Sequence, residues 1–262
     1  MTSRYEVQSW QEFLELVESD QFRGWAFRGQ SDAEWSLESS LTRRLKQYVP
    51  EKKWAEQEAR AIRVFKRKAH YFLDDTSVLD DDFRCLALMQ HHGAPTRLLD
   101  FTKSPFVASY FALHSCISTA AVFAVNTPAL WHEATPPNHP DLTREAISPR
   151  NGGHLDKYYL SNQYSVVWPG EPWSMDRRIV AQAGTFMLPG QINVSVEDLL
   201  NSYNYDKPLL AKIIIPKEIR TQAMEALYRM NISHATLFPD LDGLARSISY
   251  ELEASWIGSS RP

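Results

Sequence analysis

The segment from Gln90 to Pro105 constrains the fold more than any other part of the chain. It places two histidines, an arginine, an aspartate and three hydroxyl side chains around one glycine and two prolines, in the order QHHGAPTRLLDFTKSP. An apolar run from Phe106 to Leu113 follows directly, so the segment leads into the core. Because buried polar groups need hydrogen-bond partners, these side chains either organise the core or converge on a ligand.

The length and composition favour one globular domain spanning residues 1–262. A chain of 262 residues with 44% hydrophobic residues can bury a substantial core. The formal net charge of -4 provides no overall attraction to nucleic acid or to an anionic membrane, and no apolar run approaches the roughly 20 residues of a membrane span. Residues 1–8 lack a secretory signal pattern, so we expect a cytoplasmic protein without a membrane partner.

Helices are predicted mainly in the first half of the chain. Capping residues and apolar periodicity indicate helices starting at Ser9, Pro50, about Asp82, Ser104, Pro216 and about Leu241. The helix from Pro50 runs to about Leu73 and carries a basic face. Residues 126–158 are rich in proline and lack periodicity, which predicts a long surface insertion of the kind that often carries function.

Strands are predicted mainly in the second half. Apolar runs indicate strands at 25–27, 120–125, 164–168, 178–182, 185–188 and 210–215, with a turn at Arg28-Gly29-Gln30 ending the first. Helices and strands that separate in this way favour an α+β fold over regular alternation. We therefore expect a helical N-terminal half packed on a mainly antiparallel sheet.

Several motifs together resemble the FRG-domain family, which is named after a Phe-Arg-Gly motif. They are Ala26-Phe27-Arg28-Gly29-Gln30, the central motif at residues 90–113, Ala181-Gln182-x-Gly184-x-Phe186 and Leu237-Phe238-Pro239-Asp240-Leu241-Asp242-Gly243. The resemblance runs from about Trp25 to Leu252.

A more distant similarity is to NAD-dependent ADP-ribosyltransferases, and it implies a split sheet with NAD as the substrate. In that fold an arginine on an aromatic-Arg-Gly strand grips NAD, and Arg28 matches it. The hydroxyls of Phe101-Thr102-Lys103-Ser104 match a second strand. A third strand normally carries a glutamate that holds the ribose, but the matching position here is Gln182, which has no negative charge.

This resemblance implies a set of site residues. Arg28, Gly29, Thr96, Thr102 and Ser104 are candidates for binding NAD, and Asp100, Gln182 and His92 are candidates for catalysis. Asp100 is the nearby acid that takes the place of the missing glutamate, either as a base or by balancing positive charge on the ribose. His91 and His92 are neighbours on a helix and point about 100 degrees apart, so at most one of them is expected to serve the site.

Each of these residues also has a structural interpretation. Arg28 pairs with Asp100 in that interpretation, and Thr96, Arg97 and Asp100 stabilise the turn after Pro95 through bonds between side chain and backbone. Ser104 caps the following helix, Gln182 forms a hydrogen bond within the core, and Arg97 and the histidines belong to the scaffold.

Two other kinds of chemistry are weakly indicated. A metal site would combine His91 or His92 with Asp100, or with Asp240 and Asp242, but the usual ligand spacings are missing, so we predict no metal. A cysteine nucleophile is disfavoured because Cys85 and Cys116 lie in apolar segments, where we expect free, buried thiols.

Two classes of function remain after these considerations. The first is a transferase that consumes NAD, such as a bacterial or phage-defence toxin that modifies RNA or protein and is controlled by an antitoxin. Arg63 and Arg67, on the predicted basic helix, are the candidate residues for binding a single-stranded RNA acceptor, unless that face is merely solvated. The second class is a non-catalytic module that binds a nucleotide or a protein partner in the same cleft.

Overall fold

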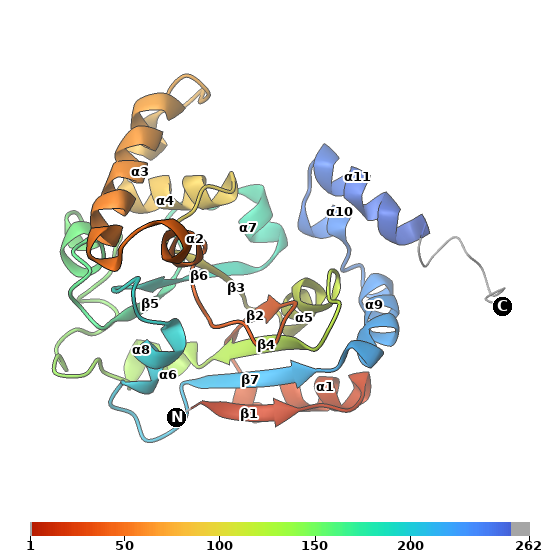
Figure 1. The fold of residues 1–262 in the computed structure, drawn as a ribbon. Helices are drawn as coiled ribbons and strands as arrows, with labels where there is room; N and C mark the ends of the chain where they lie inside the picture. The colour runs from red at the N-terminus through yellow and green to blue at the C-terminus, as the bar shows by residue number, and fades with distance from the viewer. Residues whose placement is uncertain (1, 253–262) are drawn as a thin grey trace.

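A single seven-stranded sheet forms the centre of the computed structural model, which describes residues 2–252 (Figure 1). The strand order is β1-β7-β4-β2-β3-β6-β5. Neighbouring strands are antiparallel except β1 and β7, which are parallel. The strands are β1 (Ser3–Glu6), β2 (Ala26–Gln30), β3 (Leu99–Thr102), β4 (Ala120–Val125), β5 (Val167–Gly170), β6 (Gly184–Pro189) and β7 (Leu210–Ile215). The expected α+β class and mainly antiparallel sheet are confirmed.

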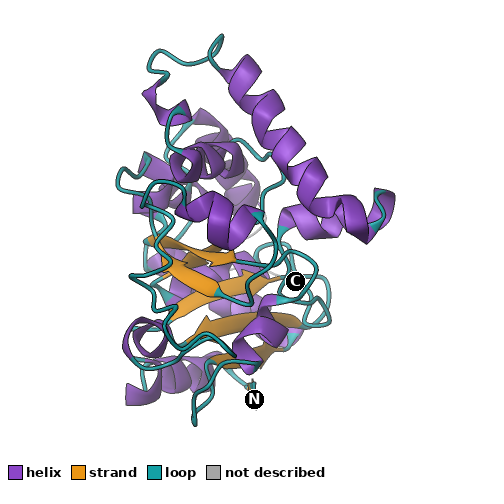
Figure 2. Cartoon of the chain, turned by 90° about the vertical axis from the view of Figure 1, so that its left-hand side faces the viewer, coloured by secondary structure: helices purple, strands orange, loops and turns teal. Residues whose placement is uncertain are grey.

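Helices lie on both sides of the strands (Figure 2). They are α1 (Trp10–Val17), α2 (Ser40–Tyr48), α3 (Trp54–Ala69), α4 (Asp82–His91), α5 (Pro105–Leu113), α6 (Thr127–His132), α7 (Arg177–Ala181), α8 (Val196–Asn201), α9 (Arg220–Arg229), α10 (His234–Leu237) and α11 (Leu241–Tyr250). Short 3-10 turns cover Asp20–Phe22, Glu51–Lys53, Ser77–Leu79 and Lys217–Ile219, and a π-helix covers Leu155–Leu160. No helix in the described part of the chain is both long and apolar enough to cross a membrane.

Alternation along the strands sends side chains into separate cores. On β4, Val122 and Ala124 face a core shared with α1, α5 and α9, while Ala121 and Phe123 face a core shared with α6 and α8. A third core joins α3 and α4 to β5, β6 and the π-helix. Each face of the sheet is thus covered, which explains why β4 is buried at every position.

Gly29 allows β2 to lie directly against α5. A Cβ atom built on Gly29 would be 2.0 Å from the carbonyl oxygen of Ala108 and 2.5 Å from the amide nitrogen of Ala112. Any larger residue would therefore push the strand and the helix apart. β2 continues through Gly29 to Gln30, so the predicted turn at Arg28-Gly29-Gln30 is wrong: glycine serves close packing here, not a change of direction.

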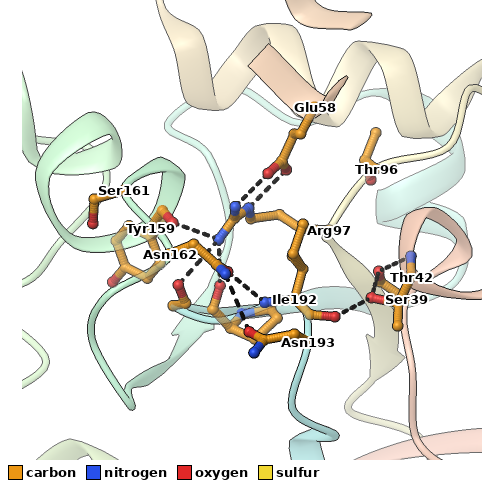
Figure 3. Close-up of polar contacts among 12 residues, drawn as sticks. Ser39, Thr42, Glu58, Thr96, Arg97, Tyr159, Ser161, Asn162, Ile192 and Asn193 are labelled. Carbon is orange, nitrogen blue, oxygen red and sulfur yellow. Dashed lines mark hydrogen bonds and ion pairs between the residues drawn. The ribbon is translucent and has the colours of Figure 1, made fainter. Parts of the chain in front are cut away.

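Arg97 holds the central motif in the core (Figure 3). Its guanidinium is completely buried and forms a two-pronged ion pair with the buried carboxylate of Glu58 on α3. Nη1 also donates to the carbonyl oxygens of Tyr159, at 2.7 Å, and Pro189, at 3.0 Å. One side chain therefore ties together α3, the π-helix and the end of β6, and the prediction that Arg97 belongs to the scaffold is confirmed.

The predicted helices and strands are mostly confirmed, with one clear exception. The helices near Ser9, Asp82, Ser104, Pro216 and Leu241 and the strands at 120–125, 185–188 and 210–215 are confirmed within a few residues. The predicted strand at 178–182 is wrong, because these residues form α7. The Asp176 side chain caps that helix by accepting from the Ile179 amide, and Ala183 then ends it with a positive φ of 47°. The predicted insertion at 126–158 begins with α6 and ends inside the π-helix.

Candidate functional site

A cleft opens beside the weakest strand pairing of the described sheet, between β2 and β3, which we call the split. β2 and β3 are neighbours in the sheet but pair only at Phe27 and Thr102, whereas β2 pairs with β4 along its whole length. The cleft beside this point has a volume of about 290 Å³, at the lower limit for ligand cavities. Its lining residues are Phe27, Arg28, Gly29, Gln30, Ser31, Trp35, Arg43, Asp100, Phe101, Thr102, Phe111, His114, Ser115, Arg178 and Gln182.

Arg28 spans the split between the two strands. Its Nη1 donates to the carbonyl oxygen of Asp100 at 2.7 Å, and its buried Nε has no hydrogen-bond partner among the described residues. Burial lowers the pKa of the Arg28 guanidinium from its usual range, with the Asp100 carboxylate opposing this and the nearby Arg43 adding to it. An arginine still remains protonated. A half-buried cation with an unused donor is a favourable place for an anion.

Two further arginines line the cleft, and sequence reasoning did not place them there. Arg43 comes from α2, which was not predicted, and its Nη1 donates to the carbonyl oxygen of Glu38 at 2.7 Å. Arg178 comes from α7, and its Nη1 donates to the carbonyl oxygen of His91 at 3.3 Å. Three guanidinium groups thus face one cleft from three elements. Arg43 stands in the basic run Arg43-Arg44-Leu45-Lys46, which by itself gives no reason to place it at the cleft.

Asp100 is the one carboxylate among the described residues that line the cleft. It is exposed, and its Oδ2 accepts a hydrogen bond from Nε2 of Gln90 at 2.7 Å. Gln90 is itself held by the hydroxyl of Thr96, which donates to Oε1 at 2.6 Å. The central motif therefore orients Asp100, which lines the cleft, through a chain of hydrogen bonds. Arg28 meets the backbone of Asp100, so the expected side-chain ion pair is replaced by a strand-to-strand bond.

Thr102 and Gln182 line the cleft, but their polar groups serve the fold. The Thr102 hydroxyl donates to the carbonyl oxygen of Gln182 at 2.7 Å and accepts from the Ser104 amide at 3.0 Å. The Gln182 amide donates to the carbonyl oxygen of Leu237 at 3.0 Å, at the end of α10. Gln182 ends α7 and does not stand on a strand, because the predicted strand at 178–182 is a helix.

The remaining sequence candidates divide by position. Gly29 lines the cleft at the contact with α5. Thr96 is buried away from the cleft, Ser104 caps α5 by accepting from the Val107 amide, and the exposed His92 ends α4. Arg63 and Arg67 are exposed on α3 and do not line the cleft.

His114 lines the cleft and was missed at the sequence level. It follows the last residue of α5, and its ring stacks on Tyr110 with centroids 5.3 Å apart. Burial lowers the pKa of His114, opposed by the backbone of Phe111 and Tyr110 and assisted by Arg220. The neutral imidazole, which is the form that can accept a proton, is therefore favoured. A lone histidine in an apolar helix gave no signal for this position.

The two alternative chemistries find little support in the described residues. Residues 2–252 contain no group of three or more His, Cys, Asp or Glu side chains that could hold a metal ion. Cys85 and Cys116 are free and buried, as expected, and burial raises the pKa of the Cys85 thiol to about 11. Such a thiol is not a nucleophile near neutral pH.

The family comparison covers the first part of this site. Residues 23–120 match the FRG domain. The FRG domain match runs from just before β2 into the start of β4, so it contains Arg28, Arg43, Asp100, Thr102 and His114. Arg178 and Gln182 lie outside the FRG domain match and complete the cleft from α7. Neither a curated protein nor a solved structure matches the chain.

Proposed function

We propose that this protein binds NAD in the cleft at the sheet split and transfers its ADP-ribose group to an acceptor. The observation that carries the proposal is the half-buried Arg28 between β2 and β3, whose buried Nε has no partner among the described residues and whose charge is repelled by the nearby Arg43. A pyrophosphate placed there would accept hydrogen bonds from both side chains and remove their repulsion.

The charge of the cleft suits a dinucleotide. Its three arginines exceed its one carboxylate by two charges, which is the charge of a pyrophosphate. Trp35 lines the same cleft and is 53% exposed, so its ring is available to stack on a base or on the nicotinamide. Because the cleft is small, the dinucleotide would be held partly at its rim and would not be enclosed.

Asp100 would supply the negative charge that the reaction needs. The bond between nicotinamide and C1′ of the ribose breaks, its electron pair leaves with nicotinamide, and the acceptor forms a new bond to C1′ and loses a proton. Asp100 would balance the positive charge that develops on the ribose, while the neutral imidazole of His114 would accept the proton. Gln182 takes no part in this scheme, since Leu237 already occupies its amide.

The first test is incubation of the full chain with NAD labelled in the adenylate phosphate and with a cell extract. Nuclease or protease digestion of the labelled material then identifies the acceptor as RNA or protein. We expect Arg28→Ala and Asp100→Asn to lose labelling, while Asp74→Asn, which changes an exposed carboxylate outside the cleft, retains it. Absence of label, together with no release of nicotinamide by the unsubstituted protein, would refute the transferase.

A non-catalytic nucleotide-binding module is the second candidate. One observation favours it: the Thr102 hydroxyl and the Gln182 amide, which the transferase similarity assigns to ribose, are bound within the protein. Calorimetric titration with NAD separates the two candidates. A transferase binds NAD, consumes it and loses turnover but not binding in Asp100→Asn. A module binds NAD and releases it unchanged.

An RNA acceptor would use the exposed face of α3. Arg63 and Arg67 are exposed there, and Tyr71 and Phe72 follow the helix with 79% and 86% of their surface exposed. Cations beside exposed rings suit single-stranded RNA. Lys66 lies on the same helix, but we do not count it as an RNA contact because its charge is paired with Asp82. The double variant Arg63→Glu/Arg67→Glu should lower labelling of RNA while leaving NAD binding unchanged, and unaltered RNA labelling would contradict this assignment.

A further inference from the structure

A second cavity of about 310 Å³ lies at the start of β2, at the opposite end of that strand from Gln30 and Ser31, which line the first cleft. Its lining residues are Gly24, Trp25, Ala26, Lys103, Thr127, Pro128, Trp131, His132, Pro169, Glu171 and Thr185. Lys103 directly follows Thr102, and Ala26 directly precedes Phe27, so the strand pair that borders the NAD cleft also borders this cavity. Nothing in the proposed transferase reaction uses it.

An alternating series of tryptophan and arginine side chains fixes one wall. The Arg144 guanidinium lies 4.0 Å from the Trp131 ring and 5.2 Å from the Trp168 ring. The Arg150 guanidinium lies 5.2 Å from Trp168 and 4.5 Å from Trp173. The two arginines come from residues 126–158, the segment that the sequence marked as a functional insertion. Their stacking holds Trp131 in one orientation before any ligand arrives.

Trp131 nevertheless keeps an accessible surface. It is 42% exposed, although Trp168 at the centre of the series is fully buried. Arg144 is fixed behind it by donating from Nε to the carbonyl oxygen of Pro169 at 3.0 Å. An indole that is immobilised on one side and open on another is a platform for a flat ring.

Charged groups stand at the edge of this platform. Lys103 Nζ lies 2.9 Å from Glu171 Oε1, and the Lys103 side chain is 64% exposed, so it can still reach an anion. Arg150 Nε donates to the carbonyl oxygen of Glu171 at 2.7 Å, which fixes that residue at the cavity. Glu171 thus holds Lys103 at the cavity, and a lysine binds phosphate as a point charge.

We infer that this second cavity is a nucleotide-binding site, with the base stacked on Trp131 and its phosphate near Lys103. A free mononucleotide and one nucleotide of a single strand present the same chemistry. A saccharide would also stack on an indole, but it lacks the anionic group that the exposed Lys103 serves. The site is independent of the NAD cleft, which is bordered by different side chains of the same strands.

The test uses the full chain carrying Arg28→Ala, so that binding in the NAD cleft does not contribute. Two probes are compared: the four nucleoside monophosphates in calorimetry, and fluorescein-labelled RNA and DNA homopolymer single strands in anisotropy. Binding of monophosphates identifies a free nucleotide as the ligand. Binding of the strands alone identifies a nucleic acid. Absence of both kinds of binding at millimolar monophosphate and high micromolar strand overturns the inference.

Matched variants then locate the binding. Trp131→Ala should weaken it about 5- to 100-fold, as for the loss of one stacked base, while Trp131→Phe should retain most of it. Trp173→Ala removes the other exposed ring of the series, which does not line the cavity, and should bind as before. Equal affinity in Trp131→Ala and the parent would overturn the inference.

Lys103→Glu provides a measurement that does not disturb the stacked rings. Its side chain is mostly exposed, so the fold should tolerate the change, which thermal unfolding verifies. For a single strand we expect at least tenfold weaker binding, and the neutral Lys103→Ala should reduce the slope of log affinity against log salt by about 0.7. An unchanged slope would contradict the placement of phosphate at Lys103.

Discussion

Arg97, which is fully buried, and Arg28, which is half-buried, show two uses of an arginine within one fold. Each guanidinium nitrogen of Arg97 has an acceptor, either the Glu58 carboxylate or one of three backbone carbonyls. Arg28 has one acceptor for Nη1 and none for its buried Nε among the described residues. The hydrogen-bond donors of Arg97 are therefore satisfied within the protein, whereas Arg28 keeps a donor that a ligand could use.

Removal of the Glu58 charge should destabilise the protein strongly. Glu58→Gln leaves the buried Arg97 without its counter-charge, and breaking such a pair costs about 3–5 kcal/mol of the free energy of unfolding. Urea unfolding measures the loss. Glu56→Gln, an exposed change on the same helix, is the control and should stay within about 0.5 kcal/mol of the parent. Equal stability of the two variants would show that the pair is dispensable.

Arg28→Lys tests the geometry of the cleft. A lysine keeps the charge but offers no planar fork, so it cannot bridge to the Asp100 carbonyl and contact a phosphate in the same way. We expect NAD affinity measured by calorimetry to fall at least tenfold. The exposed Arg23, changed to lysine in the same manner, should have no effect. Retention of full affinity in Arg28→Lys would leave the guanidinium without a role in binding.

The shape of the cleft depends on two contacts between elements, the packing of β2 against α5 and the hydrogen bond between the end of α7 and α10. Gly29 sets the first contact, and the Gln182 amide on Leu237 sets the second. Arg178 is fixed at the same junction, with its guanidinium 4.7 Å from the Phe238 ring. The C-terminal helices therefore hold two cleft residues in place without lining the cleft themselves.

Gly29→Ala should disturb both stability and the site. The added methyl would meet backbone atoms of α5 at 2.0 and 2.5 Å, which cannot move without shifting the helix. Overpacking of this kind costs about 1–3 kcal/mol or more. Thermal unfolding and NAD titration should both show a loss. The control is Gly152→Ala, which adds the same methyl in open space and should leave stability unchanged. Unchanged stability in Gly29→Ala as well would mean that β2 and α5 can separate without cost.

The contact between α5 and α10 should make stability depend on pH. Burial lowers the pKa of His234, helped by His114, and burial likewise lowers the pKa of His114, so the unfolded chain binds these protons first. The free energy of unfolding should therefore be unaffected by these groups above about pH 6.5, their usual pKa, and should fall as the pH drops below it. Tyr110 contacts His234 Nδ1 at 3.2 Å.

His234→Gln tests this dependence. Urea unfolding between pH 7.5 and 5 should show a shallower decline in the variant, while the two proteins run parallel above pH 7. A decline as steep in the variant as in the parent would assign the acid sensitivity to other groups.

For the whole molecule, the sequence predicted the scaffold better than the cleft. Periodicity and caps located most helices, and the central motif correctly suggested a polar segment entering the core. Asp100 and Arg28 were placed at one site because both stand in motifs. Arg43, Arg178 and His114 were missed, since they come from a helix without a clear signal, from a helix mistaken for a strand and from an apolar helix end. Their convergence depends on tertiary packing that no local pattern encodes.

The central motif serves mainly the fold in the structure, although the sequence suggested that it binds a ligand. Its polar residues form a hydrogen-bonded frame made of Gln90, Thr96 and Arg97. Of the cleft residues, this frame positions Asp100. Sequence reasoning assigned ligand roles to Thr96 and Ser104 because it could not distinguish a hydroxyl facing a cavity from one that caps a helix or a turn. Only the partners of each hydroxyl decide that question.

Because the cleft joins α2, β2, β3, α5 and α7, a ligand there should stabilise the whole fold. A ligand present at 100 times its dissociation constant adds about 2.7 kcal/mol to the free energy of unfolding when it binds only the native state. We expect saturating NAD to raise the midpoint of thermal unfolding by several degrees, and Arg28→Ala to abolish the shift without lowering the midpoint of the free protein by a comparable amount. Arg23→Ala should keep the full shift. A shift that persists in Arg28→Ala would place NAD elsewhere, and the cavity beside Trp131 is the site that Trp131→Ala would then test.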